Sequence, residues 1–465
     1  MAVSAPRTRQ LTDLELMGHL FRRAGFGATR EQLEAAVAKG YDATVEELLH
    51  PETQPPFEED ICYRYYIHMR ETRFHELAQD SIMYRLIASP RVLQEKMTLF
   101  WHHLFATGQA KVNNGPSMVT QMNMLRANCL GSFRTLLVEL SKDPAMIFWL
   151  DNQMNTKDVH NENYGRELLE LFSMGIGNYT EDDVKNCARA FTGWTMKSSM
   201  PGPYPYGRYP WQFKFDPDQH DYGEKEFLGE RGSFDGEDVI DIIVRHPATA
   251  QFIARRLYNF FVSERNNQAA IDELAEVFRS SNYDIRAVMR ALFMSDWFRS
   301  ADVYYSKIKS PAEHVAGVTR LVGDYQFPEY GMGQLTLDCR YMGQDLLNPP
   351  SVEGWHTGKE WIDTGTLVQR INFAVDRVGD TSKPGVRAII ERMHSKGELT
   401  PDQFVERCLD LIGPLDVADK TRSSLVDFAA KGGPLRFRSP DDPAAAQRVA
   451  EMLQMIVATR EFQLA

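Results

Sequence analysis

Helix signals recur along most of this chain and limit its fold more than any other sequence feature. Thr12 with Glu15, and Thr29 with Gln32, form S/T-x-x-E/Q capping boxes, and each box opens a run of helically spaced apolar residues. Gly25 follows the first run as a C-terminal stop. Connections between such runs are mostly short, and strands do not alternate with helices. The sequence therefore predicts an all-α fold, a multi-helix array in a single large domain.

Similar start and stop signals place helices along the remainder of the chain. Pro90 ends one predicted helix and opens the next, because proline fits the first turn of a helix and not its interior. The expected helices span residues 41–50, 61–89, 91–108, 117–130, 132–142, 144–150, 161–175, 180–194, 247–262, 268–280, 284–298, 311–323, 333–346, 363–377, 401–412, 416–430 and 443–460.

Two long irregular segments interrupt this helical pattern. Residues 200–236 are rich in Pro, Gly, Tyr and Trp, and their stretches WQFKF and KEFL are expected to pair as a small β-hairpin. Residues 347–363 keep two tryptophans. Long loops inside a compact chain are usually functional or disordered, and these aromatic residues favour packing. Since no clear linker precedes residues 376–386, we expect a main helical domain at 1–378 and a C-terminal helical lobe at 379–465 packed on it.

Composition excludes several classes of protein. The net charge of -12 argues against nucleic-acid binding, which requires a basic face. No stretch approaches 18 uncharged apolar residues, so no membrane span is expected. The five cysteines are far apart and odd in number, which fits reduced thiols. The N-terminal region contains no apolar run typical of a secretory signal, so we expect a cytoplasmic protein.

The stretch NENYGRELLELFSMGIGNYTEDDVKNCARAFTGW, residues 161–194, places charged groups beside an apolar stripe. Glu162, Arg166 and Glu170 follow one another at i+4 spacing on the flank of that stripe. They form either an exposed ladder of ion pairs or a partly buried network with shifted pKa values at a site. The core face is expected to contain Tyr164, Leu168, Leu171, Phe172 and Gly175.

The asparagines of this stretch allow two interpretations as well. Asn161 and Asn163 are poor residues for the middle of a helix, because their amides compete with the backbone for hydrogen bonds. Two amides that flank a carboxylate suit a helix cap or the floor of a ligand-binding site.

Several stretches, taken in order, resemble the motifs of a known bacterial family. They are HLFRRAGFGATREQLE, EKMTLFWHHLFAT, the 161–194 stretch, FDPDQHDYGEKEFLG, IIVRHPATAQFIARRLYNFFV, YDIRAVMRALFMSDWF and NPPSVEGWHTGKEWI. Over residues 11–460 the chain is similar to the family called domain of unknown function 1800. The resemblance implies a mostly helical fold and names no reaction. Many relatives carry an export signal and are encoded beside a second exported family that looks like a phosphatase or sulfatase, which implies a partner protein encoded nearby.

Two adjacent histidines, His102 and His103, lie in the predicted helix FWHHLF. Neighbouring helical residues point in different directions, so the two rings do not easily face one metal. One interpretation is a core histidine beside a rim histidine. The other is that His103 meets the flank of the 161–175 helix and takes part in acid–base chemistry.

The best metal candidate in the sequence is the stretch DPDQHDYGEK. Asp216, Asp218, His220 and Asp221 combine three carboxylates and one imidazole in a loop that can curl around an ion. Such residues also form ordinary turns. A further alternative is acid–base chemistry by His220, with Asp221 orienting the ring.

Two more motifs suggest ligand binding. Trp355 and Trp361 can stack on sugars or other flat ligands, or they anchor their loop to the core. In FRRAGFG, Arg22 and Arg23 lie at a helix end, where cations complement the helix dipole or hold an anion.

These features lead to two hypotheses of different classes. The first is a metal-assisted hydrolase or lyase that acts on a carbohydrate-like or anionic substrate, in a cleft between the 161–175 helix and the 200–232 loop. Glu162 or Glu170 would be the general base, Arg166 the anion stabiliser, and the cofactor a divalent metal. The second is a noncatalytic helical scaffold or binding protein with buried polar networks, favoured by the absence of G-x-S-x-G and H-E-x-x-H motifs.

Overall fold

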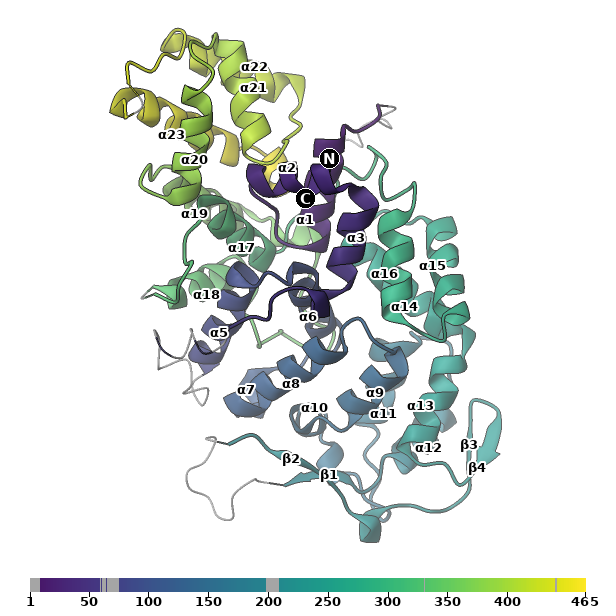
Figure 1. The fold of residues 1–465 in the computed structure, drawn as a ribbon. Helices are drawn as coiled ribbons and strands as arrows, with labels where there is room; N and C mark the ends of the chain where they lie inside the picture. Colours follow the sequence, from purple (N-terminus) through teal and green to yellow (C-terminus); the bar gives the residue numbers. More distant parts are fainter. Residues whose placement is uncertain are drawn as a thin grey trace.

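The protein is an array of helices, seen here in a computed structural model that describes residues 9–58, 60, 64, 75–197, 209–329, 331–439 and 441–465 (Figure 1). The first part of the chain contains α1 (Asp13–Ala24), α2 (Arg30–Lys39), α3 (Tyr41–Leu49), η1 (Pro51–Thr53), α5 (His75–Ala88), α6 (Val92–Leu104), α7 (Gln109–Val112), α8 (Gly115–Asn128), α9 (Phe133–Ser141), α10 (Pro144–Trp149), η3 (Asn152–Met154), α11 (Asn163–Glu167), the π-helix η4 (Leu168–Ser173) and α12 (Glu181–Ala190).

Short strands follow α12, and helices then continue along the rest of the chain. These elements are β1 (Trp194–Lys197), β2 (Gln212–Phe215), η5 (Pro217–Gln219), β3 (Lys225–Phe227), β4 (Glu230–Gly232), α13 (Gly236–Arg245), α14 (Pro247–Phe261), α15 (Gln268–Ser280), α16 (Ile285–Met294), α17 (Pro311–Val322), α18 (Met332–Tyr341), η6 (Gly358–Trp361), α19 (Thr364–Val378), α20 (Pro384–His394), α21 (Pro401–Leu411), α22 (Asp419–Lys431), α23 (Pro443–Val457) and η7 (Glu461–Gln463). The all-α prediction is confirmed.

Local sequence explains where many helices begin. Thr12 and Thr29 form the two predicted capping boxes. In each box the threonine side chain accepts a backbone N–H from the residue three positions later, and the side chain of that residue accepts the threonine N–H. Thr180 caps α12 in the same way. Two helices that the sequence did not predict, α13 and α20, begin at an Asp235 capping box and at Pro384.

The predicted pairing of WQFKF with KEFL is wrong, because each stretch has another partner. β2 pairs antiparallel with β1, and β3 pairs antiparallel with β4. Leu228 and Gly229 connect β3 to β4, and both have positive φ angles, 48° and 84°. Such a two-residue turn matches the twist of a hairpin, so KEFL closes on the residues that follow it.

Two large hydrophobic cores hold the helices together. The first includes Trp101, Phe133 and Phe172 and joins helices from α1 to α16. The second joins residues before 378 with those of the C-terminal lobe, and Val315 and Phe404 are two of its buried members. Figure 1 shows α20, α21, α22 and α23 gathered beside α2 and α19. The division into two domains stays a prediction, but the second core extends across the boundary at 378/379.

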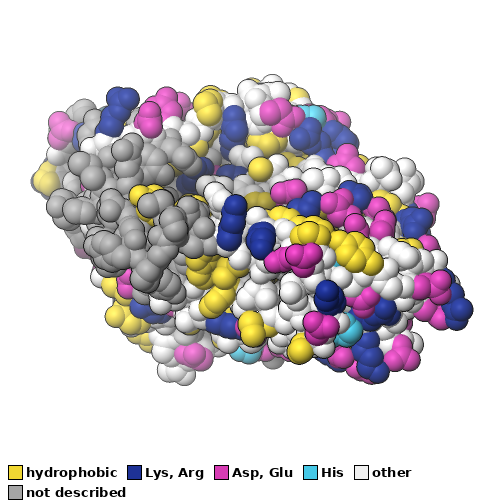
Figure 2. All heavy atoms as spheres, turned by 90° about the horizontal axis from the view of Figure 1, so that it is seen from below, with side chains coloured by type: hydrophobic (Ala, Val, Ile, Leu, Met, Phe, Trp, Pro, Cys, Tyr) yellow, Lys and Arg dark blue, Asp and Glu magenta, His cyan; other side chains and the backbone are white. Residues whose placement is uncertain are grey.

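The remaining general predictions agree in part with the structure. Four cysteines, Cys129, Cys187, Cys339 and Cys408, are free and buried, whereas Cys62 lies outside the described residues. In the described part of the chain, no helix has both the length and the apolar character needed to cross a membrane. Figure 2 shows the face that carries β1 and β2, where acidic and basic side chains are interspersed over the described surface.

Candidate functional site

The side chains of Asn155 and Asn161 fix the backbone at the start of α11, of which Asn163 is the first residue. The N–H of Asn161 donates to Oδ1 of Asn155 at 3.0 Å, and Oδ1 of Asn161 accepts the N–H of Asn163 at 3.0 Å. Asn155 is buried and donates from Nδ2 to the carbonyl oxygen of Ala188 at 2.8 Å. These bonds fix the entry into α11 against α12. Ligand binding by Asn161 and Asn163 stays a prediction.

The charged flank of α11 is a surface ladder over its first turn. Arg166 pairs with Glu162 at 3.2 Å and with Glu181 of α12 at 2.7 Å. The side chains of Glu162 and Arg166 are 38% and 33% exposed, so the pair contributes about 0–1 kcal/mol. The second predicted pair, Arg166 with Glu170, does not form. Glu170 instead accepts the hydroxyl of Tyr179 at 2.8 Å.

A π-helical segment explains why the predicted ladder stops at Arg166. In η4 each turn contains an extra residue, which shifts the side chains that follow relative to those of α11. Leu168, Leu169 and Phe172 are therefore all fully buried, whereas the α-helical wheel left Leu169 outside the core. Glu167 and Glu170 remain at the half-buried edge of the segment. π-helical turns inside helices often mark functional sites.

The two histidines of α6 lie under the 347–363 segment. Trp355 is buried, with its ring 5.2 Å from His102 in an edge contact and 6.2 Å from His103 in a stacked contact. Both ring nitrogens of His102, and Nε1 of Trp355, are buried without a hydrogen-bond partner. Burial lowers the pKa of His102 to about 3 and that of His103 to about 4. Both rings are therefore neutral at pH 7.

A glycine allows this segment to approach α6 closely. Gly354 has a φ of 92°, and a Cβ at this position would lie 2.5 Å from the carbonyl oxygen of His103. Only glycine fits such a conformation at such a distance. The close approach fixes the position of Glu353, the preceding residue, relative to α6.

Glu353 brings a third carboxylate toward the edge of η4. Burial, followed by the charges of Glu170 and then Glu353, raises the pKa of the Glu167 carboxyl, although Arg166 opposes this rise. We call Glu167, Glu170 and Glu353 the carboxylate cluster. The charge of Glu353 also acts on Arg256 of α14. The cluster thus combines segments that are far apart in the sequence.

An open groove of about 580 Å³ begins at Met174, four residues after Glu170, and its lining does not include the carboxylate cluster itself. Phe252 lines the groove, and its ring centroid lies 4.9 Å from the guanidinium of Arg256, on which the charge of Glu353 acts. Asn178 lines it next to Tyr179, the hydrogen-bond partner of Glu170. The other lining residues are Met174, His246, Pro247, Ala248, Gln251, Arg255 and Arg279.

Both tryptophans of the 347–363 segment are buried, which favours anchoring over ligand stacking. Trp355 is 4% exposed and Trp361 is 5% exposed. The ring of Trp361 lies against Gly343, and its carbonyl oxygen accepts the hydroxyl of Thr366 at 3.0 Å. Contacts of this kind hold the segment on the helices.

The histidine of the predicted metal loop has a structural partner. His220 is 5% exposed, and its Nδ1–H donates to the carbonyl oxygen of Thr192 at 2.8 Å. Phe215 and Tyr222 pack edge-on against its ring. The bond to Thr192 ties the loop to the end of α12.

The carboxylates of the same loop point to separate cations. Asp221 accepts from Nε of Arg189 at 2.7 Å, and Asp216 pairs with Lys214 at 2.8 Å. Asp218 is exposed. Among the described residues, which include 216–221, no group of three or more His, Cys, Asp or Glu side chains is placed to hold a metal ion. The predicted ligand set is therefore not assembled, because Arg189 and Lys214 occupy its carboxylates.

The predicted site residues do not converge as a single group. Glu162 lies on the exposed flank of α11, His103 under the 347–363 segment and His220 at the end of α12. Within the described residues, no hydrogen bond, ion pair or ring contact joins any two of these three side chains. Instead, the charges of Glu170 and Glu353 both act on Glu167, and Glu353 precedes the glycine that approaches the backbone of His103.

Two members of the new arrangement were missed as candidates. Glu353 lies inside the quoted motif NPPSVEGW, but only its neighbouring tryptophan suggested a role. Arg256 lies in ARRLY, where the spacing fits an ordinary exposed helix face. The sequence contained one signal for the position of Glu353. The glycine that follows it indicates a close backbone approach.

Comparison with known proteins gives the family and no activity. The model of the family described as "Protein of unknown function (DUF1800)" matches residues 19–464. The chain belongs to this family. No curated protein and no solved structure matches the chain. The DUF1800 match covers both the carboxylate cluster and the C-terminal lobe, and its helical fold agrees with the fold that the resemblance implied.

Proposed function

We propose that this DUF1800 protein is a hydrolase or lyase that uses acid–base chemistry on a carbohydrate-like, anionic substrate. The observation that carries the proposal is the half-buried Glu167, which lies on a π-helical edge within reach of the charges of Glu170 and Glu353. Neighbouring carboxylates with separated pKa values can act as acid and base in one reaction. The 216–221 loop has no part in this proposal.

The groove that begins at Met174 supports an anionic substrate. Arg255 lines it and donates to Oδ1 of Asn266 at 3.0 Å and to Oε1 of Gln268 at 2.9 Å. Both acceptors are neutral amides, and the charge of Arg255 acts also on Asp272. Arg279, which pairs with Glu276 at 2.5 Å, adds a second guanidinium to the same lining. Sulfate or carboxylate groups on a sugar chain match such positions.

The chemistry of the cluster suggests separate roles. Glu167 has the raised pKa and is the general acid that protonates a leaving oxygen. Glu353 is exposed and is the general base, acting on water or on a proton next to a carboxylate. His103 is a positioning residue, because its backbone and ring hold the segment that carries Glu353.

Turnover of anionic oligosaccharides by the full chain tests the proposal. Sulfated and uronate-containing oligosaccharides are incubated with the protein, and new reducing ends or new ultraviolet-absorbing double bonds are measured. The first product alone indicates hydrolysis, and the second indicates elimination. We expect Glu167→Gln and Glu353→Gln to lower the rate about 100-fold or more, as for loss of a general acid or base.

A matched control separates catalysis from folding. Glu181→Gln removes an exposed carboxylate on the adjacent helix α12 and should leave the rate unchanged. Absence of turnover on every substrate, or full activity of Glu167→Gln, would contradict the enzyme proposal.

A second candidate is a noncatalytic helical scaffold or binding protein. It is favoured by the satisfied polar groups around α11 and α12, where Asn155, Asn161 and His220 all have structural hydrogen bonds. For such a protein, Glu167→Gln changes only thermal stability, and affinity capture recovers one specific partner.

A further inference from the structure

A cavity separate from the carboxylate cluster lies between α1, α17 and the C-terminal lobe. It has a volume of about 70 Å³. One buried water needs roughly 10–15 Å³ of such space, so the cavity has room for a few waters or one small ion. Its polar lining comes from Arg22, Lys309, Glu313, His314 and Arg320.

Arg22 is buried in the wall of this cavity with unused donors. It is 9% exposed, and Nη1 donates to the carbonyl oxygen of Gly413 at 3.0 Å. Its Nε and Nη2 have no hydrogen-bond partner. The guanidinium lies 4.0 Å from the ring centroid of Tyr305. Since unpaired buried donors are costly, these two nitrogens point to a ligand.

Two more cations line the cavity and are also bonded to neutral groups. Lys309 donates to the carbonyl oxygen of Phe462 at 2.8 Å, and Arg320 donates to that of Ile87 at 2.6 Å. Burial lowers the pKa of Lys309 to about 7, and the neighbouring charge of Arg22 adds to this effect. An anion in the cavity would relieve this repulsion.

Glu313 is the one acidic side chain in the described lining, and other groups already occupy it. It forms an ion pair with the buried Lys96 and accepts the N–H of Ser310 at 2.6 Å. Although burial opposes ionisation, the charges of Lys96 and Lys307 lower the pKa of Glu313 to about 2. Its charge is thus balanced outside the cavity, which leaves an excess of positive charge in the lining.

The lining also offers hydrogen-bond acceptors. Nε2 of His314 donates to the carbonyl oxygen of Arg370 at 3.0 Å, so Nδ1 carries the lone pair. This Nδ1 is buried and has no partner. An anion that carries a proton, such as hydrogen phosphate, satisfies donors and acceptors together. Sulfate has no proton to donate at neutral pH.

We propose that this cavity binds phosphate, either as the free ion or as the head of a small phosphate monoester. Arg22, Lys309 and Arg320 supply the positive charge, and the unpartnered Nδ1 of His314 accepts a hydrogen bond from the phosphate O–H. The donors of Arg22 that have no protein partner bind the phosphate oxygens.

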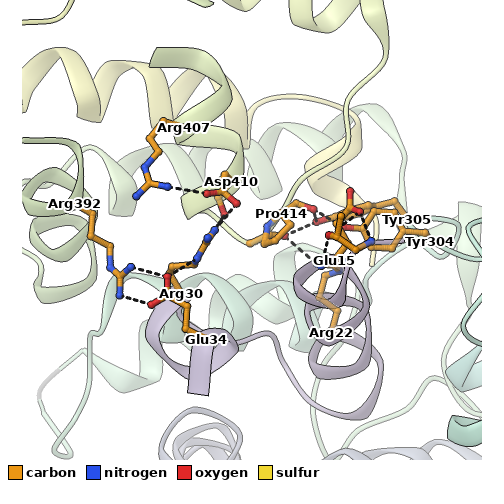
Figure 3. A network of polar contacts seen from close by, with 12 residues as sticks. Glu15, Arg22, Arg30, Glu34, Tyr304, Tyr305, Arg392, Arg407, Asp410 and Pro414 are labelled. Carbon is orange, nitrogen blue, oxygen red and sulfur yellow. Dashed lines mark hydrogen bonds and ion pairs between the residues drawn. The ribbon is translucent and has the colours of Figure 1, made fainter. Parts of the chain in front are cut away.

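The position of Arg22 makes the ligand a link between the two ends of the chain. Figure 3 shows Arg22 on α1 close to Pro414 and the tyrosines, with a second group of ion pairs to one side. In that second group Arg30 of α2 pairs with Asp410 of the lobe. Arg30 is outside the cavity lining, so its removal weakens the same joint without changing the site.

Calorimetric titration of the full chain tests the phosphate site. Inorganic phosphate, glycerol phosphate and sulfate are compared in chloride buffer at constant ionic strength. We expect saturable binding of phosphate, and binding of sulfate at least about tenfold weaker. Binding of glycerol phosphate as tightly as phosphate assigns the site to a monoester, whereas weaker binding assigns it to the free ion.

Variants locate the binding. Arg22→Met and Lys309→Met should each weaken phosphate binding about tenfold or more, as for loss of a charge-assisted hydrogen bond, and Arg30→Met should leave it unchanged. If Arg22→Met does not fold, the titrations of Lys309→Met and of the wild type test the phosphate site on their own. Absence of saturable phosphate binding, equal binding of sulfate, or unchanged binding by the cavity variants overturns the proposal.

Discussion

At the scale of single residues, buried acids make the stability of this protein depend on pH. Asp143 caps α10 by accepting the N–H of Met146 at 2.9 Å, and it also accepts Nε2 of Gln121 at 2.8 Å. Burial raises its pKa to about 7, although these hydrogen bonds oppose the rise. The native protein therefore holds a proton between pH 4 and 7 that the unfolded chain releases.

The sign of the effect follows from this difference in bound protons. As pH rises from about 4 to about 7, Asp143 should lower the free energy of unfolding, by on the order of 2–4 kcal/mol. Asp143→Asn keeps both acceptor bonds and cannot ionise, so its free energy of unfolding should decline less over this range. Urea unfolding at several pH values measures the difference.

Asp442 provides a control of opposite sign. It caps α23, and hydrogen bonds led by the N–H of Arg438 lower its pKa. Its contribution to stability is present at neutral pH and is lost as pH falls below the usual range of a carboxyl. Equal pH profiles for Asp143→Asn and the wild type would contradict the assignment of a buried, protonated Asp143.

At the scale of elements, several helix starts were predictable from the sequence and the π-helical turn was not. Capping boxes at Thr12, Thr29 and Thr180 are local signals, and the structure confirms them. The π turn of η4 depends on how Leu169 packs in the first core, which spacing along one helix cannot show. The π turn also changes the direction of the Glu170 side chain, so the predicted ion pair of Arg166 with Glu170 does not form.

The packing of α20 on α17 depends on one glycine. A Cβ on Gly385 would overlap the carbonyl oxygen of Leu321 and lie 2.8 Å from the carbonyl carbon of Val322. Gly385→Ala should lower the free energy of unfolding by about 1–3 kcal/mol, because α20 must move away from α17. Thermal or urea unfolding of the variant measures this loss.

Gly365 is the matched control in the first turn of α19. It is exposed, and its Cβ would meet only the side chain of Asp363 at 3.4 Å. Gly365→Ala should raise stability by roughly 0.5–1 kcal/mol through helix propensity. A gain in stability for Gly385→Ala would show that α17 and α20 do not pack this closely.

At the scale of the whole molecule, the second core couples the C-terminal lobe to the helices before it. All seven tryptophans lie at or before Trp361, so their fluorescence reports only the part of the chain before residue 379. Helical circular dichroism reports both parts. We expect the two signals to change together in urea, because Val315 and Phe404 belong to one core. A dichroism change without a fluorescence change would mean that residues 379–465 unfold separately.

Long-range contacts explain why only part of the candidate site was predictable from the sequence. Glu170 and His103 were predicted from local patterns; Glu170 acts on the same carboxyl as Glu353, and Gly354, the residue after Glu353, contacts His103. No local pattern could indicate that Glu353 reaches Glu167, since a close backbone contact at His103 determines this position. The predicted metal loop is not assembled partly for the same reason, because Asp221 pairs with the distant Arg189, whereas Asp216 pairs with Lys214 two residues before it.

The four buried thiols can report on local opening of the two hydrophobic cores. Cys129 and Cys187 lie in the first core, and Cys339 and Cys408 lie in the second. Burial raises the pKa of all four, so a thiolate-directed alkylating reagent can modify them only when the surrounding helices open. Mass spectrometry of the labelled peptides would then measure the opening rate of each core in the same sample.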